Sequence, residues 1–282
     1  MKLLTITCDR DFEETILQAR SIQKYLASTT HLIIVNNSVM PEDKWVSALS
    51  PFYDRHELKI EFSYDYQECT GWVSQQILKI RAVHLLDDDY VILDAKNFFI
   101  KPTDISSWTQ HGSGKALRFF DTGRIETMRY YCEKIGQPYI NEFYNIITPF
   151  VVKKELMLEL DRYKDILLED FYDSRGNIGH SEFMLYSILM KKHNIPFATV
   201  GENYPANGIS ITFFKRNEPI NVEQTINLLK RQDMYVMSGI HPNWWGTAFR
   251  NEKILLIEWL KSLDILVPEY FEKFCRPYIR PW

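Results

Sequence analysis

Cysteine is scarce in this sequence, and the four cysteines lie far apart at positions 8, 69, 132 and 275. They form no Cys-x-x-Cys pair and have no histidine at the spacing of a metal site. The pattern therefore gives no sign of a cysteine-based metal centre. Reduced cytosolic thiols are its simplest interpretation.

Long apolar runs and a strong excess of one charge sign are also missing. The first strand-like run leads directly into charged residues, so no signal peptide is expected. No run approaches the roughly 18 apolar residues that a membrane-spanning helix needs. The formal net charge is -4, which predicts no general attraction to nucleic acid. The sequence has no internal repeat and no low-complexity segment.

The 282 residues are 45% hydrophobic and 25% charged, which is ordinary for a globular protein. Short apolar runs alternate with helical patterns in the first part of the chain, and this order is typical of a nucleotide-binding α/β unit. Strands joined by a helix are expected to pair in parallel through a right-handed crossover. The predicted strands cover residues 3–7, 31–35 and 58–62, and the first predicted helix covers 12–22.

The most informative stretch is a buried run with polar residues at its end. Residues 90–93 are apolar and bounded by charge, as expected of a strand covered on both faces of a parallel sheet. Asp94, Lys96 and Asn97 come directly after this run, and open α/β sheets place ligands at the carboxyl ends of such strands. The preceding segment, 71–83, has apolar residues on one helical face.

The pattern Gly-Trp-x-x-Gln-Gln-x-x-Lys at 71–79, followed by DYVILDAKNFFIKP at 89–102, resembles the metal-site region of nucleotide-sugar glycosyltransferases with the GT-A fold. It is closest to bacterial members whose strand usually ends in Leu-Asp-Ala-Asp. The resemblance extends more weakly over most of the chain. It implies a Rossmann-like α/β catalytic domain over residues 1–250, with a mixed, mainly parallel sheet flanked by helices. A C-terminal helical extension, 251–282, is expected to pack on it.

The resemblance also implies an activity and a setting. A sugar would pass from a nucleotide-diphosphate donor of the UDP or GDP type to a hydroxyl group of a glycan or lipid-linked acceptor, with inverting transfer as the expectation. The context would be bacterial surface polysaccharide or glycoconjugate synthesis, in the cytoplasm or at the inner membrane face.

The main departure from the family pattern is at the metal motif. In the family, two Asp residues hold a divalent cation that neutralises the donor diphosphate. The second Asp is replaced here by Lys96. Either Asn97 acts as a neutral oxygen ligand beside Asp94 and His241, for manganese or magnesium, or the Lys96 ammonium replaces the cation and makes the enzyme metal-independent. His241 resembles a histidine that completes this site in many members, and a purely structural histidine is the alternative.

The donor pocket implied by the resemblance draws on several segments. The residues after the first strand touch the nucleotide in this family, although a helix-capping Asp with solvated neighbours would look the same. Lys79 would face the diphosphate or be a solvated surface lysine, and Trp72 is predicted to lie in the core. The expected donor-binding residues are Cys8, Asp9, Arg10, Gln76, Lys79, Asp94, Lys96 and Gly239.

Glu182 is the predicted catalytic base. It follows a predicted helix cap, Ser181, and the segment resembles Ser-Glu-[Phe/Tyr]-x-x-Tyr, in which the acidic residue of the family faces the acceptor. Inverting transfer needs a group that takes the proton of the acceptor hydroxyl. The alternative is a glutamate that only stabilises the start of its helix.

Two rival functions remain open from the sequence. A nucleotidyltransferase shares the α/β layout, but it normally has a glycine-rich phosphate loop after the first strand, and residues 8–11 contain no glycine. A non-catalytic sugar-nucleotide or glycan-binding protein is suggested by Lys96 at the position of the metal-binding Asp.

Overall fold

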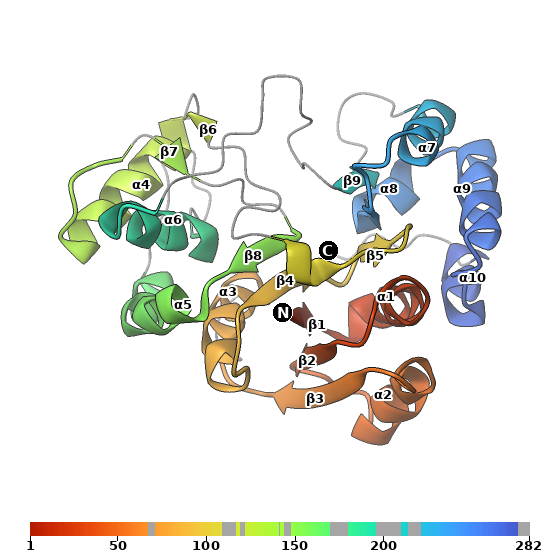
Figure 1. Cartoon of the computed structure of the whole chain (residues 1–282), viewed down its shortest axis with the longest axis horizontal. Helices are drawn as coiled ribbons and strands as arrows, with labels where there is room; N and C mark the ends of the chain where they lie inside the picture. The colour runs from red at the N-terminus through yellow and green to blue at the C-terminus, as the bar shows by residue number, and fades with distance from the viewer. Residues whose placement is uncertain are drawn as a thin grey trace.

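The computed structural model describes residues 1–66, 71–108, 117–118, 122–140, 142–143, 148–169, 180–195, 210–213 and 221–275. Its centre is a five-stranded sheet with the order β3-β2-β1-β4-β8 (Figure 1). The first four strands in the chain run parallel, and β8 is antiparallel to β4. The strands are β1 (Lys2–Thr7), β2 (Thr30–Asn36), β3 (Glu57–Ser63), β4 (Tyr90–Asp94) and β8 (Phe150–Val152).

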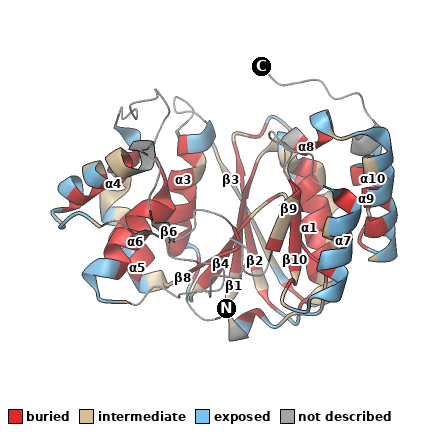
Figure 2. Cartoon of the chain, turned by 90° about the horizontal axis from the view of Figure 1, so that it is seen from above, coloured by how far each residue is buried: buried red, intermediate tan, exposed pale blue. Residues whose placement is uncertain are grey.

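Helices cover both faces of this sheet (Figure 2). One face carries α1 (Phe12–Tyr25), α7 (Val222–Arg231), α9 (Arg250–Ser262) and α10 (Pro268–Cys275). The other carries α3 (Gly71–Arg81), α4 (Thr122–Ile135), α5 (Lys154–Leu160) and α6 (Glu182–Lys192). The remaining α-helices of the described residues are α2 (Glu42–Leu49) and α8 (Pro242–Thr247). Single 3-10 turns or runs cover Asp9–Asp11, Ser50–Phe52, Ala82–His84, Ile105–Ser107 and Asp161–Leu168.

The central strands are apolar along their length because both of their faces are buried. Side chains of a strand alternate between the two faces, so Leu3 and Leu93 pack with α1, whereas Leu4 and Ile92 pack with α3 and α6. The result is two hydrophobic clusters, one on each side of the sheet. The mainly parallel α/β fold predicted from the sequence is confirmed.

A second, smaller sheet was not predicted. It has the order β5-β10-β9, with β10 (Met237–Ile240) between β5 (Asn97–Phe99) and β9 (Ser210–Phe213). β10 is antiparallel to β5 and parallel to β9. Because β5 directly follows the turn after β4, this pairing brings the late part of the chain to that turn. A two-stranded antiparallel pair is formed by β6 (Leu117–Arg118) and β7 (Glu142–Phe143).

The C-terminal helices share the core of the sheet's α1 face. Trp259 and Leu260 of α9 and Tyr270 of α10 belong to the same hydrophobic cluster as Leu3. α9 packs against α7, and α10 packs against α1. Within the described residues, no helix combines the length and the apolar composition that would let it cross a membrane.

Candidate functional site

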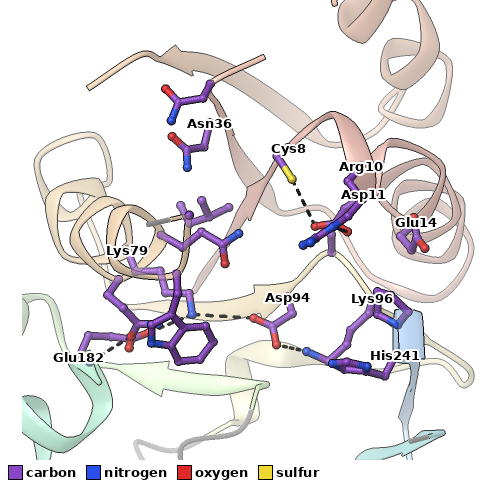
Figure 3. A pocket seen from close by; sticks show the side chains of 18 of the residues that line it. Cys8, Arg10, Asp11, Glu14, Asn36, Lys79, Asp94, Lys96, Glu182 and His241 are labelled. Atoms are coloured by element: carbon purple, nitrogen blue, oxygen red, sulfur yellow. Dashed lines mark hydrogen bonds and ion pairs between the residues drawn. The ribbon is translucent and has the colours of Figure 1, made fainter. Parts of the chain in front are cut away.

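A cavity of about 690 Å³ lies at the carboxyl ends of β1, β2 and β4 (Figure 3). This is the edge at which open α/β sheets bind ligands, and the volume lies within the range of small-molecule sites. Residues of α3 as far as Lys79, the first turn of α6, and His241 and Pro242 after β10 complete its wall. Its polar and charged lining residues are Cys8, Arg10, Asp11, Glu14, Asn36, Asn37, Gln75, Gln76, Lys79, Asp94, Lys96, Ser181, Glu182 and His241.

Four charged side chains of alternating sign form a row along the cavity floor (Figure 3). The Lys96 ammonium contacts the Asp94 carboxylate. Asp94 Oδ1 lies 3.8 Å from Lys79 Nζ, which in turn lies 2.9 Å from Glu182 Oε1. The Lys96 and Asp94 side chains are 21% and 33% exposed, whereas those of Lys79 and Glu182 are 6% and 1% exposed. The row of charges therefore runs from a partly exposed ion pair, Lys96–Asp94, to a buried one, Lys79–Glu182.

This arrangement fixes the charge of the groups. Burial opposes ionisation of Asp94, but Lys96 and then Lys79 outweigh it and hold its pKa well below the usual range. Burial also disfavours charge on Lys79, yet Glu182 and Asp94 raise its pKa above the ordinary value. Burial raises the pKa of Glu182, and Lys79 offsets only part of this effect. Lys79 is therefore a cation at neutral pH.

Asn97 holds the turn after β4 and does not line the cavity. Its side chain is fully buried, and its Oδ1 accepts hydrogen bonds from the Asp94 backbone N–H at 2.9 Å and from Thr148 Oγ1 at 2.7 Å. On the other side of the turn, Gln18 Nε2 donates to the Asp94 and Asn97 carbonyl oxygens, both at 2.9 Å. The amide oxygen expected to bind a metal is thus already engaged in the fold.

A buried hydrogen-bond network extends from Gln18 across the sheet. Because the Gln18 amide nitrogen donates to the turn, its Oε1 must accept, and Thr5 Oγ1 donates to it at 2.8 Å. The Thr5 oxygen then accepts from His31 Nε2 at 2.9 Å, which leaves His31 Nδ1 to accept from Tyr53 Oη at 2.6 Å. The network therefore requires a neutral His31. Burial, and then the nearby His56, lower the pKa of His31 to about 3.

His241 reaches the cavity because β10 pairs with β5. The Ile240 N–H donates to the Lys96 carbonyl oxygen at 3.2 Å, and the His241 N–H donates to the Phe213 carbonyl at 3.0 Å. These bonds place the imidazole on the cavity wall near Lys96 (Figure 3). Burial, followed by the charge of Lys96, lowers its pKa to about 4, so the ring is neutral at pH 7.

The residues predicted to bind a divalent cation do not fit one together. Asp94 and His241 line the cavity, but Asn97 does not, and its oxygen is taken by two donors. The Asp94 carboxylate already faces two ammonium groups, which oppose a further cation there. Among the described residues, no group of three or more His, Cys, Asp or Glu side chains has an arrangement that would hold a metal ion.

Several predicted donor-binding residues do come together. Cys8, Arg10, Gln76, Lys79, Asp94 and Lys96 all line the cavity. The Cys8 thiol donates to Asp11 Oδ2 at 3.6 Å, and burial followed by Asp11 raises its pKa, so the sulfur stays protonated.

Asp9 and Gly239 do not line the cavity. The Asp9 carboxylate accepts from the Val39 and Met40 N–H groups at 2.7 and 3.2 Å, and so joins the loops after β1 and β2. A Cβ atom at Gly239 would lie 3.2 Å from the Lys96 carbonyl oxygen, so this glycine allows β10 to approach the turn closely. Both residues support the walls of the site.

Glu182 begins α6, as the sequence predicted, but Ser181 makes no side-chain capping bond. Instead, the Glu182 N–H donates to Gln76 Oε1 of α3 at 3.1 Å. Gln76 thus acts as the cap of a helix from another segment. Gln76 is 1% exposed, so its side chain mainly contacts the protein.

Sequence reasoning misjudged Trp72 and missed Asn36. Trp72 was expected in the core, but it is 52% exposed on the cavity wall, and its Nε1 donates to the His180 carbonyl oxygen at 3.2 Å. Its position one residue before the apolar stripe of α3 was the available signal. Asn36 ends β2 and donates to Ser74 Oγ at 2.9 Å. The signal for Asn36 was its place at a strand's carboxyl end.

The mainly parallel α/β fold is similar to that of a solved glycosyltransferase. The chain is similar to the apo structure of the WbbM bifunctional glycosyltransferase, with 12% sequence identity and a TM-score of 0.52. The match covers 98% of this chain and 51% of that structure, so the chain spans about half its length. At this identity the likeness shows the fold alone.

A family match places the chain more narrowly. Residues 1–220 match the family described as "Family of unknown function (DUF6492)", and the chain belongs to that family. The comparison with curated proteins gave no match.

Proposed function

We propose that this chain is a glycosyltransferase that moves a sugar from a nucleotide-diphosphate donor to a hydroxyl group of a glycan or lipid-linked acceptor. The observation that carries the proposal is the distribution of charge in the cavity. Lys79 and Lys96 flank Asp94 on the floor, whereas Asn36 lies apart from them at the end of β2 (Figure 3). Such a site suits an elongated ligand with an anionic part and a neutral polar part.

The two ammonium groups would act on the diphosphate. When the bond between sugar and diphosphate breaks, negative charge grows on the leaving group, and fixed cations in a partly buried site stabilise it. A divalent cation supplies this charge in the family that the sequence resembles. Because the side chains here do not fit that cation, we assign its task to Lys96, with Lys79 behind it. The reaction would then proceed without metal.

Glu182 is the proposed proton acceptor for the acceptor hydroxyl. It lines the cavity, and burial raises its pKa toward the range in which a carboxylate is an effective base. Lys79, at 2.9 Å, holds it in place. Since the side chain is 1% exposed, the acceptor hydroxyl must reach the cavity floor to meet it.

A sugar-nucleotide-binding protein without catalysis is the second candidate, and one observation favours it. Both Asp94 and Glu182 are already engaged in ion pairs with lysines, whereas the proposed transfer needs a carboxylate that accepts the proton of the acceptor hydroxyl. Hydrolysis of a donor in the absence of acceptor separates an enzyme from a binder.

Calorimetric titration with UDP and GDP, each in EDTA and in manganese, tests the proposal. We expect one nucleotide to bind in EDTA, with an affinity that manganese changes less than threefold. Binding that requires manganese would contradict the metal-free assignment. Binding of neither nucleotide under either condition would contradict a donor site of the UDP or GDP type.

A further inference from the structure

The Asp94 carboxylate lies between two ammonium groups. One oxygen contacts Lys96, and the other lies 3.8 Å from Lys79. The Asp94 side chain is 33% exposed on the cavity wall. Lys79 has a second and closer anion, Glu182, so its charge does not depend on Asp94 alone. Among the residues that the structure describes, Asp94 is the carboxylate that pairs with Lys96.

We propose that Asp94 is an internal counter-anion that occupies the position of a ligand phosphate, and that a bound diphosphate displaces it from Lys96. The inference rests on the proposed function, because it takes the cavity to receive a diphosphate. A phosphate oxygen and a carboxylate oxygen make the same charge-assisted hydrogen bond to an ammonium group. The Lys96–Asp94 pair is partly exposed, so separating its partners costs little, whereas the buried Lys79–Glu182 pair is costly to break.

The role is opposite in sign to that of a metal ligand. A carboxylate that holds a cation strengthens diphosphate binding, and its removal weakens it. A carboxylate that competes for Lys96 weakens diphosphate binding through competition and like-charge repulsion, and its removal strengthens it. The direction of the change on neutralising Asp94 therefore distinguishes the two roles. In the protein without ligand, the Asp94 carboxylate balances the positive charge of Lys96 and holds its ammonium group at the turn after β4.

The test is calorimetric titration of the full chain with inorganic pyrophosphate in EDTA. Asp94→Asn keeps the size of the side chain and is expected to tighten pyrophosphate binding about tenfold, the order expected for removing one nearby anion from a partly exposed site. Asp87→Asn is the matched control. It also removes one carboxylate paired with a lysine, Lys2, but it lies before the start of β4, at the opposite edge of the sheet. Its affinity should stay within twofold of the wild type.

Two further variants show whether the protein is folded and whether pyrophosphate binds at Lys96. Asp94→Ala should reproduce the tightening if its melting temperature shows a folded chain, and Lys96→Gln should weaken binding at least tenfold. Unchanged or weaker pyrophosphate binding in a folded Asp94→Asn protein overturns the inference, as does the absence of pyrophosphate binding in every variant. Tighter pyrophosphate binding without binding of UDP or GDP would leave this inference standing and count against the proposed function instead.

Discussion

The buried ion pair between Lys79 and Glu182 predicts a large effect of removing one partner. Lys79→Met deletes the ammonium and leaves a carboxylate that is 1% exposed without its partner at 2.9 Å. Breaking a buried pair in this way costs about 3–5 kcal/mol of unfolding free energy. Asp94, at 3.8 Å from the same ammonium, also loses a favourable charge, but it keeps Lys96.

The loss should depend on pH. Without Lys79, burial raises the folded-state pKa of Glu182 further above its unfolded value. An acid with a raised folded pKa is stabilising below the unfolded pKa and loses that contribution as the pH rises through the folded pKa. The deficit of Lys79→Met should therefore be larger at pH 8 than at pH 5. Replacing both residues, as Lys79→Met with Glu182→Leu, should recover most of it, because no buried charge remains.

Urea denaturation followed by tryptophan fluorescence measures these differences. The matched control is Lys192→Met, since Lys192 pairs with Glu159 at 2.7 Å with side chains that are 32% and 19% exposed. That pair should contribute about 1 kcal/mol or less. If Lys79→Met costs no more than Lys192→Met at pH 8, the Lys79–Glu182 pair is solvated, which would contradict its description as a buried ion pair.

Glu182→Gln should leave nucleotide binding within threefold but lower donor turnover at least 100-fold; unchanged turnover would remove its role as base. On lowering the pH from 6.5 to 3, the unfolding free energy of the wild type should fall by about 1.4 kcal/mol per pH unit from His31 alone, because its folded-state pKa is depressed to about 3. His31→Gln should lose this contribution. Equal dependence of the urea midpoint on pH in both proteins would contradict a neutral His31. Gly239→Ala should cost about 1–3 kcal/mol through overpacking against the Lys96 carbonyl, whereas Gly71→Ala, whose Cβ meets nothing within 4 Å, serves as the thermal-melt control; equal melting temperatures would argue against close packing at 239.

Local patterns predicted the central sheet because its strands are buried on both faces. The runs that became β1, β2 and β4 are short and apolar, and a polar residue or turn ends each of them. The apolar composition of such a run is enough to indicate a strand that is buried on both faces of a sheet. Position at a carboxyl end was also enough to place Asp94 and Lys96 on the cavity wall.

Non-local pairing decided the parts that the sequence did not predict. β10 and β5 are separated by more than 130 residues, and nothing in either short run specifies the other. Their pairing puts His241 beside Lys96. Likewise, Asn97 looked like a ligand because it is polar and adjacent to the motif, yet two hydrogen-bond donors turn its oxygen into the core. A sequence shows residue types, whereas the direction of a side chain after a tight turn depends on its tertiary partners.

The acceptor side is the least predictable part. Between residues 121 and 147 the structure describes 122–140 and 142–143, and no residue in this stretch carried a sequence motif that assigns it to an acceptor site. Fold likeness does not define an acceptor, because specificity depends on loops that differ between proteins of one fold.

Release of free nucleoside diphosphate from a panel of UDP- and GDP-sugars in EDTA tests whether Lys96 and Lys79 replace a divalent cation in this site. We expect the wild-type protein to release the nucleotide from one donor of the panel, and we expect Lys96→Gln to lower the rate at least 100-fold while Asp87→Asn does not. Release that appears only after manganese is added would contradict the role of the lysines. If no donor of the panel releases its nucleotide, with or without manganese and with or without cell extract as a source of acceptor, that result would contradict the proposal that the protein is a glycosyltransferase.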